Sequence, residues 1–320
     1  MYSIDEIRYY DLLDPKFTRE ILDHRLSKKS LLQLQRSLNP VSERYRIKNK
    51  MAFHIFCRRA GLPTPRNLGA FHLSRTSSHD RADHRKKAVD VLNAVRLPNL
   101  ILKPVEGFYG RGIYRVDARI EDHSFLCHDH VERSAGKLFD WMASESGFTR
   151  YLIQERLRGH SQLADLSGAD GLQTVRMVTY ASSGGGIIIG GCQLRIIIGG
   201  SFVDNYCTGR TGNLIGDIPS AGGVVADVYG RADSGPGFKT VTHHPSTGIR
   251  FRGFTIPLWR ESCDLVRKAA VAFLPLRTIG WDVGITDRGP ALVEGNATWD
   301  PTNHSALGEE ILRAVQSDRP

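Results

Sequence analysis

Apolar residues recur along this chain with two different periods, and the change of period separates helical from strand-rich parts. Between residues 1 and 45, leucine and isoleucine recur at helical spacing among charged residues until Pro40 ends the pattern. A second amphipathic stretch at 46–60 predicts another helix that stops at Gly61. From residue 151 onward, short apolar runs bounded by glycine predict an antiparallel meander. Its strands are expected at Thr174–Tyr180, Gly186–Gly190 and Gln193–Ile198, and further helices at Ala88–Val95, Lys137–Met142 and Cys263–Phe273.

A glycine-rich loop interrupts the strand-like pattern near residue 107. The short apolar strand Leu100–Val105 leads into a loop that carries Gly107, Gly110 and Gly112, and the chain returns as a second strand. Because glycine adopts positive φ without steric cost, such a loop can fold its backbone amides around phosphate oxygens. Lys103 adds a positive charge on the preceding strand. The loop fits neither a Walker A motif nor a Rossmann fingerprint, since a strand follows it. The alternative is a plain glycine-rich turn.

A hairpin near the C-terminus carries a second group of polar residues. Two apolar strands, Trp281–Thr286 and Ala291–Val293, flank an Asp-Arg-Gly-Pro turn. The pairing of these strands would bring Asp282, Glu294 and Asn296 together. Three hard oxygen ligands suit Mg²⁺, which usually completes its shell with water and nucleotide phosphates. The alternative is a surface hairpin with ordinary polar ends.

Composition narrows the class of protein. The 320 residues are enough for two or three subdomains, and no run of 18 apolar residues predicts a membrane span. Five scattered cysteines without a Cys-x-x-Cys motif, and the lack of a secretory pattern at residue 1, favour a cytoplasmic protein. The net charge of +9 is spread along the chain, which argues against nucleic acid and favours small anionic substrates.

The order of these parts resembles the ATP-grasp fold. A lysine strand with a glycine loop comes first, a hinge-like segment at 151–157 follows, and the Asp282/Glu294/Asn296 hairpin comes last. Asp204-Asn205, a glycine cluster and Gly280-Trp281-Asp282 are similar to the sugar-transfer-associated ATP-grasp group. The resemblance covers roughly residues 45–305 and implies an α+β fold of two lobes that grip ATP. The expected organisation is a helical N-terminal extension at 1–45, a flap-bearing lobe at 46–153 and a C-terminal lobe with the metal hairpin at 154–320.

The resemblance also implies which residues bind ATP. Lys103 would hold the α- and β-phosphates, and the amides of the glycine loop would cover the β- and γ-phosphates. Lys50 would be a second phosphate contact, with Lys48 as an equal alternative. Mg²⁺, or Mn²⁺ in its place, would be held by the hairpin residues. The adenine and ribose contacts would come from Gln154, Glu155, Leu157 and Gln162. For Glu155 the alternative is an ordinary solvent-facing glutamate at the end of a strand. Gln162 stands where the family usually has an acidic residue.

Three further residues are expected to act on the substrate. Arg176 interrupts an apolar strand, where an unpaired buried charge would be unfavourable, so it needs an anionic partner. The resemblance suggests that this partner is the γ-phosphate or an acyl phosphate. Arg195 has a similar setting, and for both the alternative is an outward-facing position on an antiparallel sheet. Asn205 looks like the family's active-site asparagine.

The expected activity is that of an ADP-forming ligase, which activates a carboxylate as an acyl phosphate for attack by an amine or a thiol. The resemblance suggests a role in cell-surface glycan or natural-product biosynthesis. Two alternatives stay open, namely a small-molecule kinase and a non-catalytic nucleotide-binding module of a biosynthetic assembly. No feature of the sequence predicts the oligomeric state.

Overall fold

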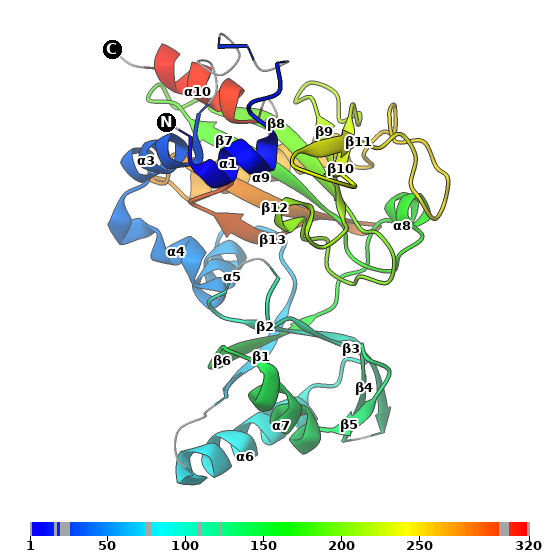
Figure 1. Ribbon diagram of the computed structural model, residues 1–320. Coiled ribbons are helices and arrows are strands. Elements are labelled where there is room, and N and C mark those ends of the chain that lie inside the picture. Colours follow the sequence, from blue (N-terminus) through cyan, green and yellow to red (C-terminus); the bar gives the residue numbers. More distant parts are fainter. Residues whose placement is uncertain are drawn as a thin grey trace. The chain divides into compact units, whose positions relative to one another are not determined.

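The chain forms two compact units, which the computed structural model shows in Figure 1. The described residues are 2–15, 18–19, 26–73, 78–107, 110–121, 123–300 and 307–318. The larger unit consists of Met1–Lys48, Phe56–Pro63 and Arg158–Pro320, and the smaller unit of Asn49–Ile55 and Thr64–Leu157. No helix in the described part of the chain is long and apolar enough to cross a membrane.

The smaller unit is built on a six-stranded antiparallel sheet with the order β1-β6-β2-β3-β4-β5. The strands are β1 (Asn67–His72), β2 (Leu100–Pro104), β3 (Tyr114–Glu121), β4 (Ser124–Cys127), β5 (Glu132–Ser134) and β6 (Arg150–Glu155). Helices α6 (Ser78–Ala94) and α7 (Ala135–Glu145) lie together beside this sheet in Figure 1, and their apolar residues complete its core with Phe71 and Tyr151. The expected hairpin around the glycine loop is confirmed, because β3 returns antiparallel to β2.

The larger unit is built on a seven-stranded antiparallel sheet with the order β11-β10-β9-β8-β7-β12-β13. The strands are β7 (Thr174–Ala181), β8 (Ile187–Ile196), β9 (Leu214–Ile218), β10 (Val228–Arg231), β11 (Phe238–Thr240), β12 (Thr278–Thr286) and β13 (Gly289–Asn296). The short helix α8 (Ser161–Ser167) precedes β7, and η2 (Cys207–Gly209) lies between β8 and β9.

Both faces of this sheet bury apolar side chains. Helix α9 (Trp259–Ala272) packs against β7, β8, β12 and β13. Just after α9, Phe273 meets the fully buried Trp281 edge-on, at a ring-centroid distance of 5.3 Å. The Trp281 indole N–H donates to Thr179 Oγ1 at 2.8 Å. Elsewhere on the sheet, Val178 and Tyr180 share a core with α3 (Lys28–Leu38) and α10 (Leu307–Ser317).

The predicted C-terminal hairpin is confirmed, whereas the predicted meander needs one correction. β12 and β13 pair antiparallel, with Asp282 opposite Glu294. The two strands expected at 186–190 and 193–198 form the single strand β8 instead. The glycines between them do not turn the chain, and the pairing with β7 absorbs the extra residue in a register shift between Met177 and Thr179.

The N-terminal region also differs from expectation. It contains α1 (Ile4–Tyr10), α3, η1 (Val41–Glu43) and α4 (Tyr45–Lys48). The helix expected at 46–60 is divided between α4 and α5 (Lys50–Arg59), because Asn49 Oδ1 accepts from the Ala52 amide and starts a new helix.

The expected boundary at residue 45 does not separate a helical extension from the rest. Residues 1–48 belong to the larger unit, together with the hairpin strands. Asn39, at the end of α3, donates its amide to the carbonyls of Thr278 at 2.8 Å and Ala297 at 3.0 Å. Its side-chain oxygen accepts from the Thr278 amide at 3.1 Å. These bonds hold α3 against β12, so the N-terminal helices form part of the scaffold of the candidate site.

Candidate functional site

Five polar side chains form a row across one face of the larger sheet. Asp282 on β12 lies opposite both Glu294 on β13 and Arg176 on β7. Arg176 in turn lies opposite Gln193 on β8, and Gln193 lies opposite Asp217 on β9. Directly paired residues of neighbouring strands share a face of the sheet. We call these five residues the polar row. The register of four strand pairs therefore assembles a site from positions far apart in the sequence.

Two arginines contact Asp282, namely its neighbour Arg176 in the polar row and Arg195 on β8. Arg176 Nε donates to Asp282 Oδ1 at 2.5 Å, and Arg176 Nη2 donates to Oδ2 at 3.2 Å. Arg195 Nη1 donates to Oδ2 at 3.2 Å, and Arg195 Nη2 lies 3.2 Å from Oδ1. The side chains of all three residues are at most 15% exposed. The anionic partner that Arg176 requires is therefore present within the protein itself.

Electrostatics keeps this cluster charged. Burial alone would raise the pKa of Asp282, but the guanidinium groups of Arg176 and Arg195 hold that pKa below its usual range. Burial similarly works against the charge of Arg195, yet Asp282, Asp204 and Glu294 raise the pKa of Arg195. Glu294 and Asp204 therefore lie close enough to Arg195 for their charges to act on it.

A loop after β8 brings Asn205 to the same region. Asp204 Oδ2 accepts from the amide and the hydroxyl of Thr174 at 2.7 and 2.6 Å, and burial raises the pKa of Asp204. Asn205 donates to Cys207 Sγ at 3.0 Å. Cys207 and Thr208 both adopt positive φ, of 45° and 56°, which non-glycine residues rarely do. Such strained conformations often mark functional loops, so this segment is a candidate part of the site.

Glu294 and Asn296 supply hard oxygen ligands beside the arginine cluster. Both are half-buried and occupy alternate positions of β13, so they share a face. Asn296 Nδ2 is buried without a hydrogen-bond partner among the described residues. Opposite Asn296 lies Gly280, where an added Cβ would stand 2.6 Å from Trp299 Cβ and 3.3 Å from Arg176 Cδ. An N–H donor does not bind a cation, but the Glu294 carboxylate and the Asn296 carboxamide oxygen are donors of the kind that Mg²⁺ prefers; the described residues contain no metal-binding group of three His, Cys, Asp or Glu.

The smaller unit holds the second cluster of expected residues. Lys50 and Lys103 are buried, at 7% and 5% exposure. Lys50 Nζ donates to the carbonyl of Gly107 at 2.8 Å, and Lys103 Nζ lies 3.4 Å from Nε2 of His54. Burial and the charges of both lysines lower the pKa of His54 to about 2. His54 is therefore neutral, and the cluster presents two ammonium groups beside the start of the glycine loop.

The glycine loop needs its glycines for conformational and steric reasons. Gly110 and Gly112 have φ of 66° and 70°, in the left-handed region. A Cβ at Gly112 would stand 2.8 Å from both Phe148 Cδ2 and Tyr151 Oη. Phe108 and Tyr109 lie outside the described residues. The loop thus begins at Gly107, which contacts Lys50, and ends at Gly112, which packs closely against Phe148 and Tyr151.

Comparison with known proteins now places the chain in a family. The model of the family described as sugar-transfer associated ATP-grasp matches residues 30–316. The chain belongs to this family. Its fold is accordingly the α+β ATP-grasp fold. The comparison with curated proteins finds no match.

Several solved structures share this fold at low sequence identity. The L-amino acid ligase from Bacillus licheniformis is 14% identical, over 86% of this chain and 49% of that protein, with a TM-score of 0.46. Carboxyaminoimidazole ribonucleotide synthase from Aspergillus clavatus, complexed with ATP, is 13% identical over 87% of this chain and 54% of that protein, with a TM-score of 0.46. D-alanyl-alanine synthetase A from Vibrio cholerae is 10% identical over 85% and 58%, with a TM-score of 0.44. This chain spans about half the length of these proteins, and we take no functional conclusion from them.

The residues expected to contact adenine and ribose in this ATP-grasp protein are engaged in other ways. Gln154 is buried on β6 and donates to Asn67 Oδ1 at 2.5 Å. Glu155 accepts from the amide and Nε of Arg66 at 2.9 and 2.7 Å, so it is not simply solvent-facing. Leu157 is half-buried after the end of β6. Gln162 is exposed at the start of α8, in the larger unit. Its backbone N–H donates to His160 Nδ1 at 3.2 Å.

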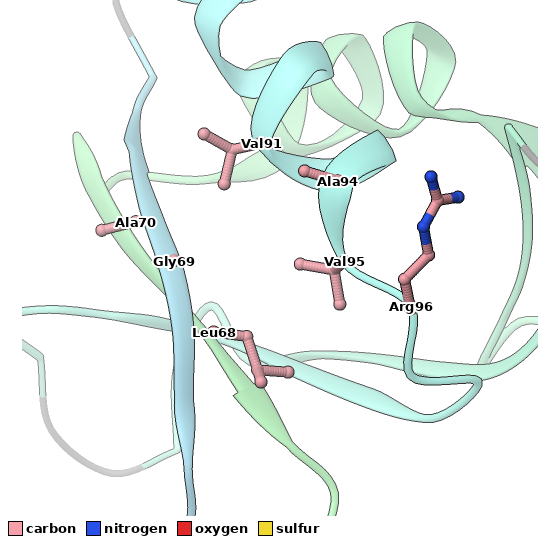
Figure 2. Close-up of a pocket in the computed structure, with 7 residues that line it drawn as sticks. All are labelled: Leu68, Gly69, Ala70, Val91, Ala94, Val95 and Arg96. Carbon is pink, nitrogen blue, oxygen red and sulfur yellow. The ribbon is translucent and has the colours of Figure 1, made fainter.

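A cavity of about 410 Å³ in the smaller unit is distinct from these residues. Figure 2 shows it between β1 and the end of α6, with Leu68, Val91 and Val95 pointing into it and Arg96 at its side. Its lining is largely apolar and includes none of the expected site residues.

Two residues of the site were absent from the sequence-based prediction. His54 follows Lys50 by four positions on α5, so the i,i+4 spacing could have indicated that they share a helix face. Asp204 was noted only as part of a motif. Its bonds to Thr174 cross between separate segments, and no local pattern signals them.

Proposed function

We propose that this protein is an ATP- and Mg²⁺-dependent ligase that joins a carboxylate to an amine or a thiol and forms ADP. The observation that carries the proposal is the cluster of Arg176, Arg195, Asp282 and Glu294 on one face of the larger sheet, in a member of an ATP-grasp family. Phosphoryl transfer mainly requires charge stabilisation and positioning, and fixed guanidinium groups beside a carboxylate provide both.

The nucleotide and the metal would use different residues. Lys50 and Lys103 would contact ATP phosphates, with the backbone amides of the glycine loop as further donors. Gln154, Glu155 and Leu157 would lie at the adenine edge mainly through backbone groups, and Gln162 would contact the ribose. Glu294 and Asn296 would hold Mg²⁺, which when bound neutralises phosphate charge.

The proposed reaction has two steps. A carboxylate oxygen attacks the γ-phosphorus of ATP, the bond to the β,γ-bridging oxygen breaks, and ADP leaves. The amine or thiol then attacks the acyl carbon, phosphate leaves, and the nucleophile loses its proton to solvent or a base. Arg176 and Arg195 would stabilise the charge that develops on the transferred group, and Asn205 would orient the substrate. The family description points to a substrate from sugar-transfer chemistry, in the synthesis of a glycan or a natural product. We place the reaction in the cytoplasm, in keeping with the five free cysteines.

Two alternatives predict different products. A small-molecule kinase would leave the phosphoryl group on a stable product and release no free phosphate. A non-catalytic nucleotide-binding module would bind ATP without forming ADP. The charged cluster around Asp282 favours a catalytic protein. Three buried charged side chains usually stabilise a fold no better than apolar side chains of similar volume, so their presence is better explained by a function than by stability.

Trapping with hydroxylamine tests the proposal. The protein is incubated with ATP, Mg²⁺, hydroxylamine and a panel of sugar-derived and amino-acid carboxylates, and ADP, phosphate and hydroxamate are measured. The ligase mechanism predicts a hydroxamate together with equal amounts of ADP and phosphate for a carboxylate of the correct class. ADP without free phosphate would instead identify a kinase. AMP and pyrophosphate would contradict both mechanisms. Glu294→Gln should nearly abolish turnover, and Asp264→Asn, an exposed change on α9, should not.

A further inference from the structure

We infer that Asp282 is not a metal ligand but the anchor that holds Arg176 and Arg195 in place, and that Glu294 and Asn296 alone supply the protein ligands of the metal. The inference rests on the proposed function and changes the role expected for Asp282 from its position in the hairpin. It follows from the contacts that the two arginines make with the Asp282 carboxylate.

The two arginines contact both carboxylate oxygens of Asp282 and donate three hydrogen bonds to them. An ionised carboxylate has about four lone-pair sites. Oδ1 contacts Arg176 Nε at 2.5 Å and Arg195 Nη2 at 3.2 Å. Oδ2 contacts Arg176 Nη2 and Arg195 Nη1, both at 3.2 Å. Each oxygen thus has two guanidinium nitrogens within 3.2 Å, so a cation could reach Asp282 only by displacing an arginine.

Charge leads to the same assignment. A divalent cation at Asp282 would lie beside two guanidinium groups, and like charges at such short range repel strongly in a buried environment. Removing the arginines to make room would leave two buried cations without their carboxylate, which is strongly destabilising. Glu294 is one strand further from Arg176, at the edge strand β13, and is half-buried.

The arrangement gives Asp282 a positioning role. A guanidinium carries five N–H donors in a rigid plane. Arg176 donates to Asp282 through Nε and Nη2, and Arg195 donates through Nη1 and brings Nη2 within 3.2 Å of Oδ1. Each therefore keeps donors directed away from Asp282, in orientations that the carboxylate fixes. Two oriented guanidinium groups suit the transferred phosphoryl group, whose charge is spread over three oxygens.

Mn²⁺ affinity distinguishes a metal ligand from a residue that only positions the arginines. It is measured on the protein in the presence of a non-hydrolysable ATP analogue. Mn²⁺ binding is measured by electron paramagnetic resonance in wild type, Glu294→Gln, Asn296→Ala, Asp282→Asn and the exposed control Asp264→Asn. Loss of Glu294 or Asn296 should weaken Mn²⁺ binding by at least the roughly 10–100-fold that loss of an outer-shell partner causes. Asp282→Asn should weaken it by less than about threefold, as expected from a through-space charge alone. A loss in Asp282→Asn equal to that in Glu294→Gln would overturn the inference.

A second measurement uses wild-type protein and does not depend on the folding of a variant. The Arg176 Nε–H, bonded to Asp282, should give a slowly exchanging signal in ¹⁵N nuclear magnetic resonance spectra, assigned by its absence in Arg176→Lys. The signal should persist on addition of Mg²⁺, with or without the ATP analogue. Its loss on addition of Mg²⁺ would show that Asp282 exchanges its arginine for the metal, contrary to the inference. If wild type binds no Mn²⁺ with the analogue, the proposed function fails, and this signal still decides the role of Asp282.

Discussion

The two clusters of expected site residues bury positive charge in opposite ways. In the larger unit, the guanidinium groups of Arg176 and Arg195 are matched by Asp282, with Asp204 and Glu294 nearby. In the smaller unit, Lys50 and Lys103 both act on a neutral histidine, His54, whose pKa they lower together with burial. One cluster carries its counter-charge within the fold, and the other places two lysines beside an imidazole that burial and their charges keep unprotonated.

This difference indicates different tasks. An arginine pair held by a carboxylate is organised before any ligand binds and can stabilise a transient charge without reorganisation. A pair of lysines with a positive field attracts a stable anion such as a phosphate group. We therefore expect changes at the arginines to affect the rate of reaction and changes at the lysines to affect nucleotide affinity.

The largest effect is expected for Arg176→Ala. Loss of one oriented donor at a developing charge typically lowers kcat by about 10²–10³-fold, and we expect a loss of this size with the ATP affinity little changed. Steady-state release of phosphate with the carboxylate found by trapping, together with nucleotide binding by calorimetry, measures both quantities. Arg176→Lys should restore little of the rate, because a lysine cannot make the two contacts with Asp282.

The control for this change is Arg267→Ala, which removes an exposed guanidinium of α9 that pairs with Asp264. It should leave kcat and ATP affinity at wild-type values. A fall in ATP affinity as large as the fall in kcat for Arg176→Ala would contradict the division of tasks, since it would place Arg176 on the ground-state nucleotide.

Lys103→Met should produce the next largest effect, on binding. A hydrogen bond from a charged group contributes about 1.5–3 kcal/mol, so the dissociation constant for ATP should rise about 10–150-fold. Methionine keeps most of the volume and removes the charge. Isothermal titration calorimetry with a non-hydrolysable analogue measures the change, and Lys268→Met on the exposed side of α9 is the control. Unchanged affinity in Lys103→Met would mean that the lysine cluster does not bind the nucleotide.

His54 gives a test that needs no ligand. Its pKa is about 2 in the folded protein and 6.5 in the unfolded chain, so the unfolded state takes up the proton first as the pH falls. The stability contribution is therefore complete above pH 6.5 and is lost progressively below it, by about 1.4 kcal/mol per pH unit. His54→Gln should remove this part of the slope.

Urea denaturation between pH 7 and pH 5 measures the slope as a difference between variant and wild type. The exposed His243→Gln is the matched control and should keep the wild-type slope. If wild type and His54→Gln lose stability in parallel, His54 is not held neutral, and the contrast between the two clusters disappears.

The sequence predicts the elements of both clusters better than their contacts. Short apolar runs beside turn residues and glycines predict the β12–β13 hairpin and the strand-loop-strand around Gly107, because these depend on neighbours in the chain. The partner of Arg176 is different. Asp282 lies 106 positions away, and only the register of β7 with β12 brings them together.

Other differences have the same physical origin. Whether Gly190 turns the chain or extends a strand depends on the pairing of β8 with β7, and not on local preference. Pro40 ends the helical pattern in the sequence, but the three hydrogen bonds of the preceding Asn39 to β12 and the segment after β13 are tertiary contacts that no local pattern predicts. Residue types thus indicate the chemistry of a site, whereas long-range register decides which groups meet.

The smallest expected effect concerns the glycine loop, and it tests whether the lysine cluster has a cover that responds to nucleotide. Arg111 is exposed in this loop between Gly110 and Gly112, so trypsin should cleave after it in the free protein. If ATP phosphates draw the loop amides around them, bound protein resists cleavage. At a nucleotide concentration equal to its dissociation constant, half of the molecules are bound and the cleavage rate should fall about twofold. Cleavage at Lys239, an exposed residue of β11 in the larger unit, is the internal control and should not change. Equal rates at Arg111 with and without nucleotide, while calorimetry shows binding, would mean that the lysines bind phosphate without help from the loop.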